Sequence, residues 1–216
     1  MSMDRLEGGR ALLDVFRHSL RSSWPLCLLV LIIFTLGLIC GALNLTFLPP
    51  VQIQELHDYM NTFIKEVRNL DLETGRVAWE AMYGKMLIMV ALYLLGLTFI
   101  GIPVILALVF LKGFVLGFTV AFLNYDLAWS GLLLALACII PQHLLYLPAL
   151  FVGAVASLSF ALVLLPRPSS TWSKIWGSFA SYTGVMLVAL TVAVGAGLVE
   201  AFLTPWLTRM VVGILE

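Results

Sequence analysis

The sequence predicts an all-α membrane protein: a polytopic helical bundle of about five transmembrane spans, with broken helices and with amphipathic helices at the interfaces. Hydrophobic residues make up 62% of the 216 residues and charged residues only 11%, whereas about 25% of a typical soluble domain is charged. The charges are also segregated, because none lies within the stretches 22–54, 86–111, 127–166 and 175–199. Each stretch is long enough to cross the ~30 Å hydrocarbon core of a bilayer as a helix. We therefore expect residues 1–216 to form a single integral membrane domain.

Composition and motifs exclude several classes of function. The net charge is zero, which argues against a nucleic-acid partner, since such proteins carry a basic face. Cys27, Cys40 and Cys138 all fall in apolar runs, and their odd number suits neither a disulfide framework nor a zinc site. The polar segments contain no Ser/His/Asp or Cys/His arrangement, no H-E-x-x-H, no Walker loop and no dinucleotide fingerprint. We therefore expect no enzyme activity, no catalytic residues, no cofactor and no metal.

The chain begins with a predicted cytoplasmic interfacial helix over residues 1–23, followed by a first span over 24–48. The N-terminal segment has apolar residues on one face and arginines on the other, which is typical of a helix in the headgroup plane. The arginines place it in the cytoplasm by the positive-inside rule. Small-xxx-small pairs permit close helix contact within the subunit or in a homodimer, and the sequence has two of them, Gly37 with Gly41 and Gly113 with Gly117. Pro49 and Pro50 should end the first span, because proline has no backbone donor.

Residues 49–85 predict an extracytoplasmic helical segment. Apolar side chains recur there at alternating spacings of three and four residues, which is a heptad pattern; they are Ile53, Leu56, Met60, Phe63, Val67 and Leu70. This apolar seam has two interpretations: a helix that lies on the protein's own membrane surface, or a docking helix for a partner. The pattern alone favours the first, because fewer than three heptads are short for a coiled coil.

Residues 86–123 are too long for one crossing, since 38 residues make about 57 Å of helix at 1.5 Å per residue. Gly101 and Pro103 offer a break, because glycine is permissive and proline lacks a backbone donor. We therefore expect a tight hairpin between spans over 86–101 and 103–123. A rival topology, with one span over 86–111 and a re-entrant 113–123, would put the basic loop at 167–174 outside, against the charge rule.

The rest of the chain predicts two further spans. A short loop over 124–126 leads to a broken span over 131–165, which contains Pro141 and Pro148. The last span covers 179–204. The tail, 205–216, has one apolar face and predicts another short interfacial helix.

Lys112 is predicted to lie near the bilayer midplane, where a charge costs at least about 2.5–3.5 kcal/mol and must face protein or water. Gln142 and His143 should lie at a matching depth, and Pro141 frees a backbone carbonyl four residues earlier. One interpretation is a polar conduit or relay; the other is a structural anchor that pins the broken span. The sequence favours the anchor, because no acid is expected at the same depth: Glu200 is predicted to lie nearer the outer surface, in headgroup water.

Two motifs carry a resemblance to a known family. The run GIPVILALVFLKGFVLGFTVAFL, followed by IIPQHLLYLPA, resembles the stage II sporulation protein M family of bacterial membrane proteins over nearly the whole chain. In the wider family the second motif often reads like P-H-G-x-x-E-x-P-A, with an intramembrane acid. Gln142, His143 and Tyr146 stand at the corresponding positions here, and Tyr146 in place of the acid weakens a proton-relay interpretation.

The resemblance implies a non-catalytic scaffold in the cell membrane, at the septum or in the mother-cell membrane that surrounds the forespore. Its implied partners are stage II sporulation proteins P and D, which are peptidoglycan hydrolases of septal wall thinning and engulfment. The resemblance also favours partner docking through the apolar seam. Two alternatives remain: a transporter or permease subunit with a polar site around Lys112, Gln142 and His143, and a family member that works with other partners in a cell that does not sporulate.

Overall fold

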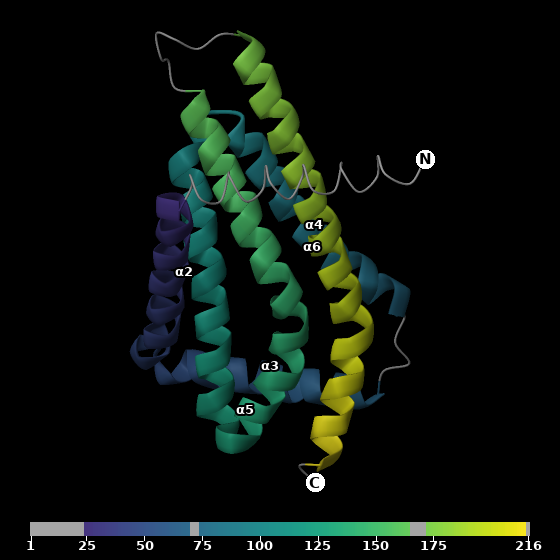
Figure 1. The fold of residues 1–216 in the computed structure, drawn as a ribbon. Coiled ribbons are helices and arrows are strands. Elements are labelled where there is room, and N and C mark those ends of the chain that lie inside the picture. Colours follow the sequence, from purple (N-terminus) through teal and green to yellow (C-terminus); the bar gives the residue numbers. More distant parts are fainter. Residues whose placement is uncertain (1–23, 70–73, 165–171, 215–216) are drawn as a thin grey trace.

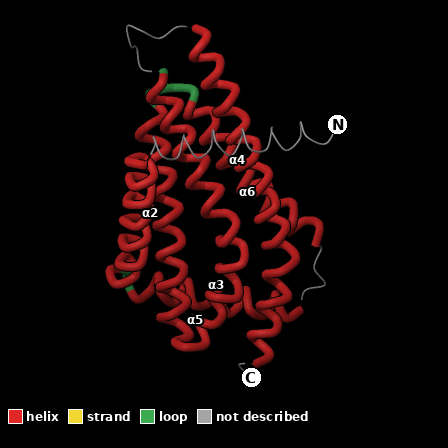
Figure 2. The backbone as a smooth tube through the Cα atoms, in the orientation of Figure 1, coloured by secondary structure: helices red, strands yellow, loops and turns green. Residues whose placement is uncertain are grey.

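The computed structural model describes residues 24–69, 74–164 and 172–214, and gives the backbone only for some of them, chiefly 63–69, 74–78, 126–142 and 202–214. The N-terminal helix predicted over 1–23 lies outside the described residues. Within them every regular element is a helix (Figure 2), which confirms the all-α class.

The helices form an upright bundle with one helix lying across its end (Figure 1). In chain order they are α2 (Trp24–Asn44), the short 3-10 helix η1 (Leu45–Phe47), α3 (Pro50–Asn69), α4 (Thr74–Gly96), α5 (Gly101–Val163) and α6 (Trp172–Ile214). α3 crosses the lower end of the bundle in Figure 1, which we call the α3 end. The turn between α4 and α5 lies at the opposite end, which we call the turn end.

The membrane-spanning character of the bundle follows from the length and composition of its helices. Four described segments are long and apolar enough to cross a bilayer: Trp24–Phe47, Gly101–Tyr125, His143–Val163 and Trp176–Ala201. A fifth apolar segment, Met82–Gly96, is shorter. These segments confirm a polytopic helical bundle, in which α4 contributes less apolar length than the predicted span.

α5 reverses direction and therefore supplies two of these segments. Its first half, up to Tyr125, runs towards the α3 end, and its second half, from His143, returns beside it (Figure 1). The loop predicted over 124–126 is wrong, because the backbone there remains helical. Asn and Asp lower helix propensity only modestly, and residues 124–130 contain no glycine or proline. The reversal lies between Tyr125 and His143.

The turn between α4 and α5 lies four residues before the predicted break. α4 ends at Gly96 and α5 begins at Gly101, so Gly101 and Pro103 belong to the first helical turn of α5. Proline is well tolerated there, because the first backbone N–H groups of a helix have no intrahelical partner. Gly101 is required for the tight turn, since a Cβ atom would overlap the backbone carbonyl of Leu95.

Three other predicted boundaries also change. α2 ends at Asn44, and Pro50 begins α3 instead of ending the first span, in keeping with the preference of proline for the first helical position. α4 runs from Thr74 through the boundary predicted at residue 85. α6 continues to Ile214, so the predicted tail over 205–216 is not a separate helix; a single proline removes one backbone hydrogen bond without ending a helix of this length.

Exposed aromatic side chains mark both ends of the bundle. Trp24 and Trp176 lie near the turn end, and Phe47, Trp79 and Tyr83 lie near the α3 end, all of them more than half exposed. Such residues are enriched at membrane–water interfaces. The 21 residues of α2 between these levels make about 32 Å of helix, which matches the hydrocarbon core.

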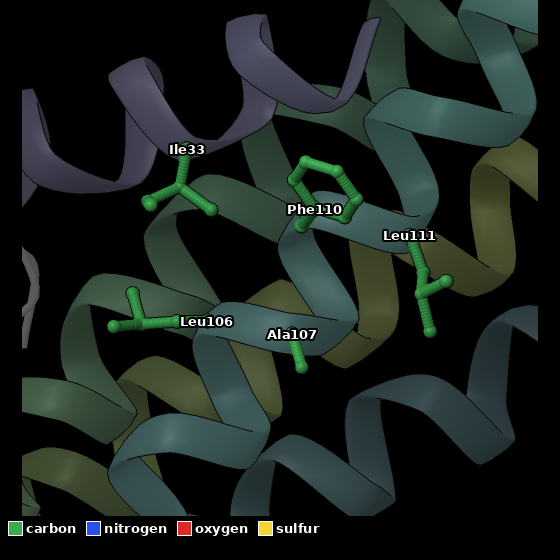
Figure 3. Close-up of a pocket in the computed structure, with 5 residues that line it drawn as sticks. All are labelled: Ile33, Leu106, Ala107, Phe110 and Leu111. Carbon is green, nitrogen blue, oxygen red and sulfur yellow. The ribbon is translucent and has the colours of Figure 1, made fainter. Parts of the chain in front are cut away.

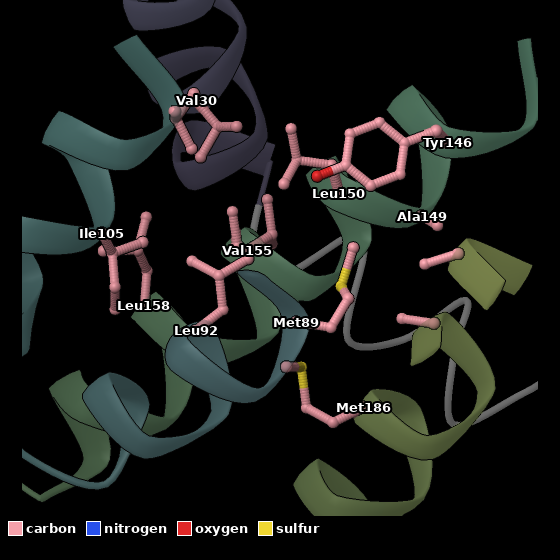
Figure 4. Packing of buried hydrophobic residues seen from close by; sticks show 14 of the residues in the cluster. Val30, Met89, Leu92, Ile105, Tyr146, Ala149, Leu150, Val155, Leu158 and Met186 are labelled. Carbon is pink, nitrogen blue, oxygen red and sulfur yellow. The ribbon is translucent and has the colours of Figure 1, made fainter. Parts of the chain in front are cut away.

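The interior is packed from α2, α4, α6 and both halves of α5 (Figure 4). Its fully buried side chains include Val30, Met89, Leu92, Ile105, Val109, Leu150 and Leu158. In a bilayer the surrounding lipid is as apolar as these residues, so close packing, and not transfer from water, holds them together.

A hydroxyl cluster closes the bundle near the turn end. The Tyr182 hydroxyl donates to the backbone oxygen of Tyr93 at 2.9 Å and lies 3.1 Å from Ser157 Oγ. The last four carbonyls of a helix lack intrahelical partners, and that of Tyr93 is one of them in α4. Gly96 lies so close that a Cβ atom would overlap the Tyr182 hydroxyl. The end of α4 is therefore fixed to α6 and to the returning half of α5.

Candidate functional site

Four polar side chains from four helical segments form a layer across the interior of the bundle. They are Lys85 of α4, Lys112 of the first half of α5, Tyr146 of its second half and Glu200 of α6. Each lies three or four residues, one helical turn, from a buried core residue on the same face. Those core residues are, in the same order, Met89, Val109, Leu150 and Ala196, none more than 1% exposed.

The direction of each helix places the four residues on the same side of the core. α4 and the second half of α5 run away from the α3 end, so Lys85 and Tyr146, which precede their core residues, lie on its α3 side. The first half of α5 and α6 run towards the α3 end, so Lys112 and Glu200, which follow theirs, lie there too. We refer to Lys85, Lys112, Tyr146 and Glu200 as the polar layer.

Lys112 lies near the middle of the bundle's apolar thickness. Gly113, the neighbour of Lys112, packs against the backbone of Phe34, which is halfway along the 21 residues of α2. Phe34 also contacts Phe151 edge to face, with 5.1 Å between ring centroids. Tyr146 lies five residues from Phe151, or about 7.5 Å towards the α3 end at 1.5 Å per residue. The predicted mid-depth of Lys112 therefore agrees with its position in the fold.

Lys85 is the most engaged member of the polar layer. Its Nζ forms an ion pair with Glu200 Oε2, and the two side chains are 12% and 31% exposed. The same Nζ lies over the ring of Tyr146, 5.7 Å from the centroid, which is within cation–π range. The described members of the layer thus carry two positive charges and one negative charge.

Tyr146 is buried, and its hydroxyl group forms no hydrogen bond with the described residues. The residue is 4% exposed, and its hydroxyl has no hydrogen-bond partner in the described part of the chain. His143 meets the Tyr146 ring edge to face, with 6.3 Å between the ring centroids. The tyrosine ring is therefore held by its neighbours, while its hydroxyl points into the interior of the cluster (Figure 4).

The ion pair of Glu200 with Lys85 is a contact that the sequence did not predict. The sequence suggested that Glu200 lies nearer the outer surface than Lys112, and Glu200 is the penultimate residue of the apolar segment Trp176–Ala201. Sequence reasoning also missed Lys85, which was assigned to the extracytoplasmic segment. A usable signal existed, because Lys85 precedes one predicted span and Glu200 lies near the end of another, both towards the same face of the membrane.

The predicted contact of Lys112 with the proline break stays a prediction. The side chains of Gln142 and Pro141 are outside the described set. No hydrogen bond or ion pair joins Lys112 to any side chain that the structure does describe. The anchor interpretation is thus neither confirmed nor contradicted.

The glycines predicted at helix contacts pack against one another. A Cβ atom at Gly37, Gly41, Gly113 or Gly117 would overlap, in that order, the backbone carbonyl groups of Phe110, Phe114, Phe34 and Leu38. The two small-xxx-small pairs therefore interlock α2 with the first half of α5, and this contact is the most extensive between any two elements of the described chain. These glycine faces are therefore used within the subunit.

The seam residues predicted for docking lie on α3. Ile53 and Leu56 are partly buried, and Val51 beside them is exposed. The side chains of Met60, Phe63 and Val67 lie outside the described set. The contacts of α3 with the bundle are few and involve mainly α6.

An apolar groove on the outside of the bundle offers no polar group to a ligand. It lies between α2 and α5 and is lined by Ile33, Leu106, Ala107, Phe110 and Leu111 (Figure 3). In a membrane protein such a surface faces lipid tails. No group of three metal-ligating side chains occurs among the residues that were placed.

Comparison with the models of known families assigns the chain to a family. The model of a family described as Stage II sporulation protein M matches residues 30–205. The chain belongs to the stage II sporulation protein M family. It is therefore a sporulation-related, multi-pass membrane protein, and the resemblance inferred from the two motifs is confirmed. No curated protein and no solved structure matched the chain in the same comparisons.

The matched segment includes the glycine interlock and the whole polar layer, since residues 30–205 contain all of these positions. It also includes α3. The family assignment therefore covers each feature that bears on function, although the match by itself gives no role to any single residue.

We expect Gly117→Ala to destabilise the protein, because the added Cβ overlaps the Leu38 carbonyl and forces α2 away from α5. Gly184→Ala is the matched control, since nothing lies within 4 Å of a Cβ there. Alanine in a helix is favoured over glycine by roughly 0.5–1 kcal/mol, so the control should be neutral or slightly stabilising. Thermal unfolding of the purified proteins in detergent measures both, and equal stabilities would contradict the interlock.

We expect Lys85→Met to destabilise the protein by about 3–5 kcal/mol, the usual cost of leaving one partner of a buried ion pair uncompensated. Partial exposure of Glu200 reduces this figure. The double variant Lys85→Met with Glu200→Leu should recover most of the loss. A double-mutant cycle of unfolding free energies measures the coupling, and additive effects of the two changes would show that the pair contributes nothing.

Proposed function

We propose that the protein is a non-catalytic scaffold that recruits peptidoglycan hydrolases to the septal membrane. The partners are stage II sporulation proteins P and D, and the process is septal wall thinning and engulfment during endospore formation. Family membership supports a sporulation role, and α3 is the feature that carries the docking proposal. A recruiting protein needs a surface outside the bilayer that is not consumed by its own fold.

α3 provides such a surface. It lies across the end of the bundle and makes few contacts with it (Figure 1). Val51 is 68% exposed, and the acidic residues Glu55 and Asp58 are exposed beside the partly buried Ile53 and Leu56. An amphipathic helix of this kind can lay its apolar face against a partner's groove or helix.

The charge rule supports an orientation in which this surface lies where cell-wall enzymes work. The positive-inside rule places the basic N-terminal segment in the cytoplasm, and α2 then carries the chain to α3 on the outer side. Labelling of a cysteine placed at the exposed Gln52 by an impermeant thiol reagent tests this orientation in intact cells. A position that labels only after the membrane is opened would contradict it.

The proposal assigns no catalysis to this chain because of where its polar groups lie. Lys112 and Tyr146 lie within the apolar thickness of the bundle, and Lys85 and Glu200 are paired with each other. α3 carries acidic side chains but no paired acid and nucleophile in the described part of the helix. The hydrolytic chemistry is therefore assigned to the recruited partners.

A transporter or permease subunit is the second candidate, and the polar layer is the observation that favours it. Polar residues at mid-depth between helices are a common feature of transporters. The two functions differ in their response to Lys112→Met, because an apolar replacement of similar shape can be nearly neutral for a structural lysine. Under the scaffold function, sporulating cells with normal levels of the variant complete engulfment; failure of engulfment at normal protein levels favours transport.

We expect Met60→Glu combined with Phe63→Glu to abolish recruitment and stall engulfment, because two charges on the apolar seam of α3 oppose burial against a partner. The matched control is Gln52→Glu with Gln54→Glu, which adds the same two charges at exposed positions of the same helix. Membrane staining of sporulating cells and co-purification of protein P measure the outcome. If cells with wild-type levels of the seam variant engulf normally, docking through α3 is contradicted.

A further inference from the structure

The helix that carries the proposed docking surface has little hold of its own on the bundle. α3 makes few contacts with the other helices, and these involve mainly α6. Among its described side chains only Ile53 and Leu56 are partly buried, and the others are exposed. A helix with so few contacts keeps its position through the elements to which the chain joins it. The attachments of its two ends are therefore the features that place it.

The N-terminal end of α3 is attached through η1 and α2. Two residues, Leu48 and Pro49, separate η1 from α3. Leu45 of η1 is buried, and η1 contacts α5. One turn earlier, on α2, a Cβ atom at Gly41 would overlap the backbone of Phe114. This end of α3 therefore continues the closely packed contact of α2 with α5.

The C-terminal end of α3 is attached through α4. Residues 70–73 join the two helices, so the position of this end depends on where α4 is held. Gly197 of α6 is buried against Met82 of α4, and a Cβ atom at Gly197 would lie 2.9 Å from Met82 Cγ and 3.0 Å from Met82 Cα. Three residues further along each helix, Lys85 forms its ion pair with Glu200. Residues three apart share one face of a helix, so the two contacts belong to one surface between α4 and α6.

The opposite end of α4 is fixed separately by the hydroxyl cluster, where Tyr182 donates to the backbone oxygen of Tyr93. From Tyr93 back to Thr74, where α4 begins, the helix measures about 28 Å at 1.5 Å per residue. A pivot of about 10° at Tyr93 would move Thr74 by about 5 Å over that length. The contacts of Met82 and Lys85 oppose such a pivot, because they hold α4 to α6 at about 17 and 12 Å from Tyr93 along the helix.

We propose that Met82, Lys85, Gly197 and Glu200 form a clamp between α4 and α6 that positions α3. These four residues, the α4–α6 clamp, touch no partner protein themselves. Without the clamp, α3 remains attached through η1, while its C-terminal end moves with the released start of α4. The consequence for recruitment rests on the scaffold function proposed above: the clamp sets the angle at which the apolar seam of α3 meets a hydrolase.

The chain offers a matched pair of positions for testing the clamp. A leucine at Gly197 has to displace Met82, whose backbone lies at the position of the new side chain. Gly195 stands two residues away on the same helix, and nothing lies within 4 Å of a Cβ atom there. Leucine has a higher helix propensity than glycine at either position. A difference between Gly197→Leu and Gly195→Leu therefore reports on the contact with α4.

The test measures distances by double electron–electron resonance on the full chain in detergent, with the three cysteines replaced by serine. One spin label is placed at Asn124, an exposed residue of α5, and the other at Thr62 or at Gln52, which are exposed residues of α3. Thr62 reports on the C-terminal half of α3, and Gln52 reports on its first turn. We expect Gly197→Leu to shift or broaden the distance from Asn124 to Thr62 and to leave the distance to Gln52 unchanged. Gly195→Leu should match the wild type in both distances.

Two further variants cover the ion pair and a failure to fold. Glu200→Gln removes one charge of the pair at nearly constant shape and should also broaden the distance to Thr62; an unchanged distance would overturn the part assigned to the ion pair. The proposal is overturned if folded Gly197→Leu gives the wild-type distance to Thr62. It is also overturned if the distances to Thr62 and Gln52 change alike, because that would show a general loosening of the bundle. If Gly197→Leu does not fold, Gly197→Ala, which adds only the Cβ atom, is measured with the same expectations.

Recruitment separates the clamp from the scaffold function. Co-purification of the hydrolase from sporulating cells is compared for Gly197→Leu and Gly195→Leu at equal protein levels. A changed distance with recruitment lost only in Gly197→Leu supports both proposals. A changed distance with normal recruitment contradicts docking through α3 and leaves the clamp standing, whereas an unchanged distance overturns the clamp whatever the recruitment.

Discussion

The contact between α2 and the first half of α5 is the constraint on which the rest of the bundle depends. Four glycines bring the two backbones so close that each would-be Cβ overlaps a carbonyl of the other helix. In a bilayer no transfer from water favours one helix contact over another, so the closeness of packing decides which helices pair. This interlock fixes the rotation of α5, and with it the direction in which Lys112, next to Gly113, must point.

Lys112 stands beside the buried face of α5 and is itself partly buried. The core is fully buried, whereas Lys112, the ion pair of Lys85 with Glu200 and the phenol of Tyr146 lie on its α3 side. Charges inside a membrane are tolerated when they face protein and find partners. The polar layer and the glycine interlock are thus two consequences of the same helix orientation.

The division between bundle and α3 has a similar physical basis. The glycine faces and the polar groups of the bundle contact one another inside it. In contrast, α3 lies outside that packing and makes few contacts with the bundle. The proposed scaffold function needs such an arrangement, since a docking surface must keep apolar residues available to a partner.

The sequence alone determined the solvent, the helical class and the approximate length of each apolar segment, because these depend on composition and on local spacing. Both glycine pairs were identified as contact faces, but only the tertiary structure decided that they face each other, since a small-xxx-small pair does not name its partner. The sequence placed the turn at Gly101 and Pro103, whereas in the structure it lies at residues 97–100. The prediction was misplaced because proline is as compatible with a first helical turn as with a break. The partner of Lys85 could not be predicted either: Glu200 lies 115 residues away, and the stacking of α4 against α6 that brings them together is a property of the packed bundle.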